Sequence, residues 1–373
     1  MAFSLVTSDS DSDLEGLGQL SDWDNSASDS DSDDIDLHDD GFRGRRASRK
    51  IRRINYMQSL DDAEFTFRFR LSKPAVNQLL NEIIPFIRVT SSRNHGVSPI
   101  HQLLLTLRFY ALGTMLISIA DFVGVSKSTA GRIVRDISIC IARLYDKYIH
   151  VQQGGAEKFY RIAGFPRVLG TIDCTHIRIQ SPCRLVGEEF RNRKGYFSYN
   201  IQAVCDADLR LMNVVARWPG SAHDATIFNN SVLRAQCDAG QFGNHWLLGD
   251  SAYPNRPYLL TPVLNPVTEA ELRYNQAHIK TRNTIERTFG VWKRRFPVLA
   301  LTLRLSQPVT QSVIIATAVL HNICRNHSLE EVPPEVEILG GDNNVEDGSQ
   351  NMDMQDISGR TDLINNFFNS EEN

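Results

Sequence analysis

The chain has 373 residues, of which 42% are hydrophobic, so it is long enough for two or three domains with a sizeable core. Its six cysteines show neither a CxxC spacing nor a paired zinc pattern, and no apolar run reaches the roughly 18 residues of a membrane helix. The first residues are polar and acidic, unlike a signal peptide. The composition therefore argues against a disulfide scaffold or a membrane-spanning protein and favours the reducing cell interior.

Charge is distributed unevenly along the chain. Residues 1–42 hold 13 acids without any Lys or Arg, and residues 329–373 carry a net charge of −11. Since the whole chain carries −4, the part between them, 43–328, carries +20. Such a body is expected to bind a polyanion, with which the acidic ends would compete, although solvated basic faces on an ordinary enzyme would have the same composition.

Composition and periodicity divide the chain into four predicted parts. Residues 1–60 are expected to be a disordered Ser/Asp-rich tail followed by a basic arm, because alternating Ser and Asp leave little to bury. The seven Lys and Arg residues of 43–53 suit a nuclear localisation signal, a phosphate-binding arm or a solvated linker. A helical region is predicted over 61–150, an α/β domain over 151–328, and an acidic, mostly disordered tail over 329–373.

Helical spacing of apolar residues dominates the second part. Residues 61–87 follow it, with Ser72 as a helix start, and three more helices are predicted at 98–112, at 118–123 and from about Ser126. The last two resemble a helix-turn-helix, with a Gly-containing turn between them. A three-helix packing unit without DNA contact is the alternative. In the DNA-binding reading, bases and phosphates would be contacted by Lys127, Ser128, Thr129 and Arg132.

The third part opens with a predicted linker at 151–166 and then alternates strands and helices. The expected elements are a strand at 168–179, a hairpin at 198–221 turning at 206–208, a helix at 223–236, strands at 246–248 and 258–263, a helix from about Asn283 and a last apolar helix at 309–323. Three antiparallel strands extended by parallel ones, with helices on the faces, predict an α/β fold of the ribonuclease H type.

Three acids stand where this fold would place a metal site. Asp173 lies in the middle of the first strand, Asp250 ends the fourth, and Glu286 lies on the later helix. Convergent carboxylates suit Mg²⁺, because hard divalent cations take oxygen ligands, and a pair of such ions cleaves phosphodiesters by activating water and steadying the leaving oxygen. Each acid alone is most often a turn residue, a helix cap or a surface charge, but the set together favours catalysis.

A His-Asp pair forms a second constellation. Asp224 either caps the helix that it begins or serves as a fourth acid near the metals, and the preceding His223 could contact phosphate. Together with His176, the pair would also suit a phosphohydrolase that binds a transition metal through imidazole. That alternative is weaker, because no further His stands at a matching spacing.

Basic residues surround the predicted site in two groups. Near the later helix they are suited to holding phosphates, although solvated faces would look the same. This group contains Arg282, Arg287, Lys293, Arg294 and Arg295. Before the second strand, the same role is predicted for Arg191, Arg193 and Lys194.

Six stretches of the chain carry a resemblance to a known family. They are VLGTIDCTHIRIQSP, NRKGYFSYNIQAVCDAD, WPGSAHDATIF, LLGDSAYPNRPYLLTP, YNQAHIKTRNTIERTFGVWKRRFP and AVLHNIC. Over about residues 65–328 the chain resembles the PIF/Harbinger transposases and the Harbinger transposase-derived nucleases. The resemblance implies that the DDE triad of the family falls on Asp173, Asp250 and Glu286, in an RNase H-like domain that uses Mg²⁺ or Mn²⁺.

The resemblance also implies partners and a location. Besides DNA, the family typically works with a separate Myb/SANT-like protein that supplies DNA binding and nuclear import. The nucleus is therefore the expected location, with the cytoplasm as a second one. No membrane association is expected, and homo-oligomerisation is left open. The Ser/Asp tail is not a feature associated with the family, so its role stays open.

The sequence therefore predicts a metal-dependent DNA endonuclease/transposase of the DDE superfamily. Water activated between Asp173 and Asp250 would attack a phosphodiester and free a 3′-hydroxyl, which in a transposase then attacks target DNA. The alternative is a domesticated nuclear DNA-binding or adaptor protein that has lost catalysis and merely retains the acids.

Overall fold

The computed structural model describes residues 53–87, 96–182, 187–329 and 358–369. The predicted Ser/Asp tail and nearly all of the basic arm lie outside the described residues. Within the described ranges, no helix combines the length and the apolar character that a membrane crossing needs.

The first described part is helical, as its apolar spacing predicts. Ser72 and Ser126 cap two of its helices by accepting hydrogen bonds from the backbone N–H groups of Ala75 and Thr129. Gly124 adopts a φ of 69° in the turn between the two helices of the predicted helix-turn-helix, a conformation that glycine adopts without strain. The elements are α2 (Tyr56–Ser59), α3 (Asp62–Phe69), α4 (Lys73–Ile83), η2 (Ile84–Phe86), α5 (Pro99–Leu112), α6 (Leu116–Val123), α7 (Lys127–Ala142) and α8 (Tyr145–Tyr148).

The second part is built on a mixed sheet of five strands in the order β3-β2-β1-β4-β5. The pairs β1–β2 and β2–β3 are antiparallel, and β4 and β5 extend the sheet in parallel to β1. This arrangement confirms the predicted α/β fold of RNase H type. The strands are β1 (Val168–Arg178), β2 (Ser198–Cys205), β3 (Leu211–Pro219), β4 (Trp246–Leu248) and β5 (Leu259–Leu260).

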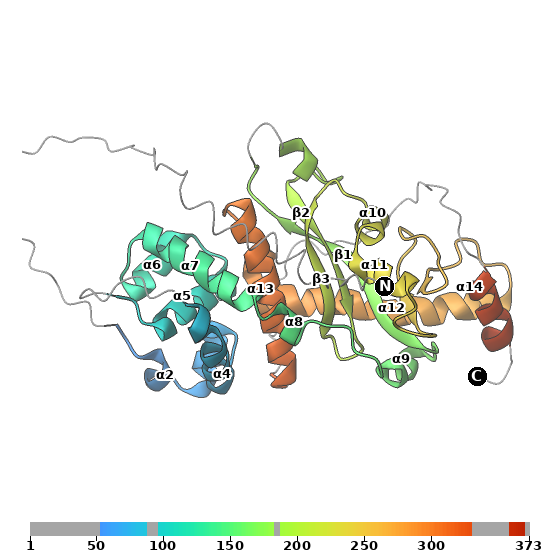
Figure 1. Ribbon diagram of the computed structural model, residues 1–373, viewed down its shortest axis with the longest axis horizontal. Helices are drawn as coiled ribbons and strands as arrows, with labels where there is room; N and C mark the ends of the chain where they lie inside the picture. The colour runs from blue at the N-terminus through green and yellow to red at the C-terminus, as the bar shows by residue number, and fades with distance from the viewer. Residues whose placement is uncertain (1–52, 88–95, 183–186, 330–357, 370–373) are drawn as a thin grey trace, which may run out of the picture.

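Helices cover both faces of this sheet (Figure 1). On one face, α12 (Glu269–Arg295) contacts β1 and β2, and α13 (Gln307–Asn326) contacts β3. On the other face lie α10 (Asp224–Asn229) and α11 (Val232–Asp238), with α10 packed on β2. The remaining turns are η3 (Gly187–Phe190) and η4 (Pro297–Leu299).

Two of the predicted elements differ from the structure, and helical turns are also found in the C-terminal part. The expected linker at 151–166 contains α9 (Ala156–Ala163), whose Phe159 is fully buried. The helix expected from about Asn283 begins fourteen residues earlier, at Glu269, where Thr268 and Glu271 form a capping box. The C-terminal tail contains α14 (Ser358–Leu363) and the π-helical turn η5 (Ile364–Phe368), which pack against α12.

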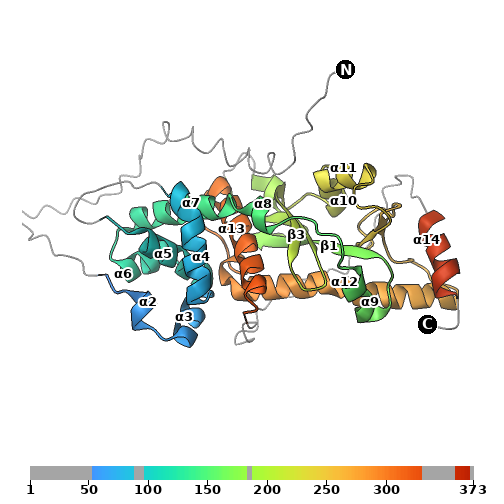
Figure 2. The same cartoon turned by 60° about the horizontal axis from the view of Figure 1, so that its bottom comes forward.

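The helical region and the sheet share one hydrophobic core. Its buried residues include Leu107 of α5 and Ile137 of α7 together with Ile201 of β2, Trp292 of α12 and Ala316 of α13. Helix α13 lies between the two parts and contacts both α7 and β3 (Figure 2). Because apolar surface buried in common must be exposed to separate the parts, the helical region is held rigidly against the sheet.

Truncation of one central side chain tests this shared core. Trp292 is fully buried, so Trp292→Ala should lower the free energy of unfolding by about 3–5 kcal/mol, seen as a lower urea midpoint. Leu272→Ala on the same helix is the control, because this side chain is 48% exposed, and its effect should be within about 0.5 kcal/mol. Equal shifts for the two variants would contradict the packing described.

Candidate active site

Two of the predicted acids lie at the same level of neighbouring strands. Leu248, the last residue of β4, pairs in parallel with Thr171 of β1. Asp250 comes two residues after Leu248, and Asp173 comes two residues after Thr171. Gly249 allows this close approach, since a Cβ there would lie 3.0 Å from the Tyr253 ring and 3.3 Å from Ile172. The parallel register therefore brings the two carboxylates together.

The third acid is connected to the first through an arginine. Arg282, one turn before Glu286 on α12, donates from Nη1 to Oδ2 of Asp173 at 2.9 Å and from Nη2 to Oε1 of Glu286 at 2.5 Å. The side chains of Asp173 and Arg282 are 13% and 16% exposed, whereas that of Glu286 is 52% exposed. Glu286 thus stands at the mouth of the site and Asp173 at its base.

Asp250, Asp224 and Arg282 lie close enough to Asp173 to act on its charge. Burial raises the pKa of Asp173 well above its ordinary value, and the carboxylates of Asp250 and Asp224 raise it further, while Arg282 opposes the rise. Burial works against the charge on Arg282, but Asp173, Glu286 and Asp250 outweigh it and raise the pKa of the guanidinium. The site is therefore an excess of negative charge in a poorly solvated place, which stabilises any cation that enters.

Asp224 approaches from the other face of the sheet. It is buried at the first turn of α10, where its Oδ1 accepts a hydrogen bond from Nδ2 of Asn200 at 2.8 Å. The same amide group donates to the carbonyl of Ala222 at 2.9 Å. Next to it, the Cys174 thiol lies 3.4 Å from the hydroxyl of Tyr253, and burial raises the pKa values of both groups well above their ordinary values. Asp224 is thus held rigidly behind the site.

The donor set fits a hard divalent cation in its chemistry. Asp173, Asp250, Glu286 and Asp224 offer carboxylate oxygens, the ligands that Mg²⁺ and Mn²⁺ prefer. In the part of the chain that the structure describes, no three His, Cys, Asp or Glu side chains converge closely enough to form a ligand group. The guanidinium of Arg282 lies between Asp173 and Glu286 in this arrangement and supplies the positive charge there.

The basic residues predicted to hold phosphates fall into different environments. Lys293 lies on the same face of α12 as Glu286. It donates to Oγ1 of Thr175 at 2.6 Å and to the carbonyl of His176 at 3.1 Å. Arg193 reaches Nδ1 of His223 at 2.6 Å, which opposes metal binding through that nitrogen. Arg191 is paired with Glu188 at 2.8 Å. The exposed members of these groups are Arg191, Arg193, Lys194 and Arg287, while Lys293 and Arg294 are half-buried.

The helix-turn-helix residues lie at an exposed helix start. Lys127 is the first residue of α7, and Arg132 lies one turn further and donates to Oγ1 of Thr129 at 3.3 Å. Both are exposed, while Ala130, which lies between them, and Ile133, which follows Arg132, are buried in the core. The polar side of α7 therefore points to solvent, as DNA contact requires.

Sequence reasoning missed the central contact of the site. It assigned Arg282 to phosphate binding, whereas the guanidinium joins Asp173 to Glu286. The signal was present, because Arg and Glu four residues apart share one face of a helix. Asn200 was also missed. An Asn inside an apolar strand pattern, with no turn to explain it, is the kind of signal that indicates a buried polar partner.

Comparisons with known proteins agree with this geometry. Residues 172–322 match a family model described as DDE superfamily endonuclease. The chain is 35% identical over 266 residues to "Putative nuclease HARBI1" of Bos taurus, covering 66% of this chain and 76% of the relative. The chain belongs to the Harbinger transposase-derived nuclease family. The predicted resemblance is confirmed, and so is a nuclease/transposase-derived function carried by a DDE endonuclease domain.

Other relatives match over similar lengths of the chain. The Homo sapiens protein of the same name is also 35% identical over 266 residues, again covering 66% of this chain and 76% of its own. "Protein ALP1-like" of Arabidopsis thaliana is 25% identical over 300 residues, covering 74% of this chain and 68% of its own. No solved structure matches the chain.

The charge excess at the site predicts an unusual dependence of stability on pH. Because the folded state raises the pKa of Asp173 above its ordinary 3.8, that carboxyl lowers stability progressively as pH rises from about 4 through its folded pKa. Asp173→Asn removes this loss. Without divalent cations, the variant should equal wild type in urea midpoint near pH 4 and exceed it at pH 7. A variant less stable than wild type at pH 7 would refute the charge-excess argument.

Proposed function

We propose that this member of the Harbinger nuclease family is a divalent-metal-dependent endonuclease that hydrolyses DNA phosphodiester bonds, with Mg²⁺ or Mn²⁺ as its cation. The observation that carries the proposal is the approach of Asp173 and Asp250 along adjacent parallel strands, with Glu286 connected to Asp173 through Arg282. The net charge of +20 over residues 43–328 supports a polyanionic substrate.

The acids are assigned different roles by their environments. Asp173 on β1 and Asp250 just after β4 would hold the cation, and the half-exposed Glu286 would complete its coordination from α12. Asp224, fixed by Asn200, is the candidate fourth ligand. When bound, the cation lowers the pKa of water and stabilises the charge of the leaving oxygen. A strand transfer by the freed 3′-hydroxyl would extend the same chemistry to transposition.

Arg282 is assigned a double role in this proposal. Without a cation, Arg282 balances the negative charge of the acids, because its Nη1 and Nη2 are hydrogen-bonded to the carboxylates of Asp173 and Glu286. A cation held by the acids would take over that balance, and Arg282 would then be available to turn toward the mouth of the site, where Glu286 stands. A planar guanidinium is well suited to accept a phosphate there in a bidentate manner.

The same arginine favours one alternative function. A guanidinium that stays between Asp173 and Glu286 would exclude a cation, and the chain would then be a DNA-binding or adaptor protein without catalysis. This reading predicts DNA binding that is independent of divalent cations and of the acids.

One isosteric substitution separates the two functions. Asp250→Asn should reduce Mg²⁺-dependent nicking of supercoiled DNA by at least about 100-fold. Loss of a residue that only orients a metal ligand already lowers activity by up to about 100-fold, and loss of a ligand should cost no less. DNA binding should be unchanged or slightly stronger, since a negative charge is lost. Asp238→Asn at the exposed end of α11 is the control and should leave nicking unchanged. Undiminished nicking by Asp250→Asn would remove the catalytic assignment.

The contribution of the helix-turn-helix is measured by the salt dependence of binding. For duplex DNA, the logarithm of the binding constant falls as the logarithm of the salt concentration rises, and each phosphate contact steepens this slope by about 0.9. Lys127→Ala and Arg132→Ala should each lower that slope by about one and leave the nicking rate at saturating DNA unchanged. Lys158→Ala on α9, outside the predicted DNA-binding residues, is the matched control. An unchanged slope in both variants would show that α7 does not contact phosphate.

A further inference from the structure

The C-terminal segment 358–369 lies against the first half of α12, on the far side of the molecule from the helical region (Figure 1). Leu363, Ile364 and Phe368 are buried there. The Phe368 ring lies 5.6 Å from that of Phe165 and 5.5 Å from that of Tyr274, measured between centroids. An otherwise acidic stretch of chain thus ends in an apolar anchor.

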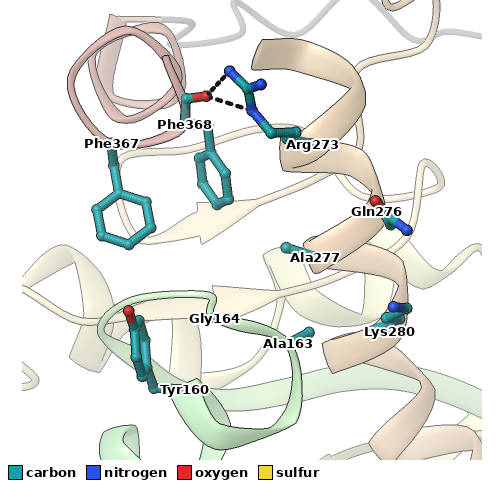
Figure 3. A pocket seen from close by; sticks show the side chains of 9 residues that line it. All are labelled: Tyr160, Ala163, Gly164, Arg273, Gln276, Ala277, Lys280, Phe367 and Phe368. Atoms are coloured by element: carbon teal, nitrogen blue, oxygen red, sulfur yellow. Dashed lines mark hydrogen bonds between the residues drawn. The ribbon is translucent and has the colours of Figure 1, made fainter. Parts of the chain in front are cut away.

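Two arginines fasten this segment to the rest of the protein, one from within it and one from α12. Nη1 of Arg360 donates to the carbonyls of Thr261 and Pro262 at 3.2 and 3.1 Å. Nε and Nη2 of Arg273 on α12 both donate to the carbonyl of Phe368, at 2.9 and 2.7 Å (Figure 3). Because the second contact holds the last residue of η5, it determines where the following residues leave the anchor.

A pocket of about 290 Å³ opens at that point, between α9, α12 and η5. No acidic residue lines it, and two cations do, Arg273 and Lys280. Among the described residues, Lys280 forms no ion pair. The other lining residues are Tyr160, Ala163, Gly164, Gln276, Ala277, Phe367 and Phe368 (Figure 3). The pocket therefore suits an anionic group on a short, partly apolar stem.

We propose that this pocket is a docking site for an acidic peptide and that its occupant is the segment 370–373 of the same chain, Ser-Glu-Glu-Asn. The carboxylates of Glu371 and Glu372 pair with Lys280 and with the remaining nitrogen of Arg273. Three residues of extended chain beyond Asn369 span about 10 Å, which is enough to cross a pocket of this volume. So short a tether also gives the glutamates a very high effective concentration at the pocket.

Charge decides between this occupant and a DNA strand. Aromatic rings beside Lys and Arg also suit a nucleotide. However, residues 329–373, two of which (Phe367 and Phe368) line this pocket, carry a net charge of −11 and repel a polyanion. The pocket also lies on the opposite side of α12 from the acids, because Lys280 and Arg282 are separated by about 200° around the helix. The occupied pocket would therefore stabilise the position of α12 from the side away from the acids and take no part in the chemistry.

The test measures amide hydrogen exchange of residues 360–368 in the full chain. The pair Glu371→Gln/Glu372→Gln and the single Lys280→Gln should each accelerate exchange by about two- to five-fold, the range of partly exposed ion pairs. The three changes combined should accelerate it no further, because both sides of one interaction have been removed. Added salt should abolish the differences. Asp362→Asn, which removes one negative charge on the exposed side of the same segment, is the control and should have no effect.

Three results would overturn the proposal. The first is unchanged exchange in Glu371→Gln/Glu372→Gln. The second is an additive effect of the combined changes, which would mean that the glutamates and Lys280 act separately. The third is weaker DNA binding in Lys280→Gln but not in the glutamate pair, which would assign the pocket to a nucleotide. None of these readouts depends on nuclease activity, so the proposal can fail while the catalytic assignment stands.

Discussion

The site depends on one electrostatic constraint, the gathering of carboxylates where little water reaches them. Asp173 and Asp250 are brought together by the parallel register of β1 and β4, and Asp224 adds its charge from the opposite face. Such a cluster is stable only if positive charge is supplied. Arg282 provides it by reaching from α12 to two acids at once. The rest of the fold can be understood as the scaffold that keeps these four side chains in place.

The scaffold achieves this by making α12 unusually well anchored. Its first turn is held by a capping box, its middle is packed on the sheet through Ile285 and Phe289, and its last turn buries Trp292 and Arg295. The guanidinium of Arg295 donates to the carbonyl of Arg70 at 3.2 Å, which connects the end of the helix to the helical region. A helix fixed at both ends presents Arg282 and Glu286 at a constant height above the sheet. Precision at the site is thus produced by contacts far from it.

The succession of the strands and the approach of Asp173 and Asp250 could be predicted, because both depend on local signals. Buried apolar runs indicate the strands, and a turn at 206–208 indicates the hairpin. The start of α12 could not, because residues 269–282 are too polar for their periodicity to be recognised. The C-terminal segment was hidden for a similar reason, since three apolar anchors stand in an acidic stretch. The contacts of Arg282 and Asn200 depend on rotamers and on the register of distant strands, including a bulge in β2–β3, which no local pattern specifies.

The shared core has a consequence for how the protein would act on a long polymer. The exposed face of α7 and the acids at β1 and β4 belong to one rigid body, joined through α13. If a DNA duplex contacts both, the distance between the two contacts is fixed by the folded protein. The offset between the contacted bases and the cleaved bond would then be a constant number of base pairs. A pair of modules joined by a flexible linker would instead cut over a range of positions.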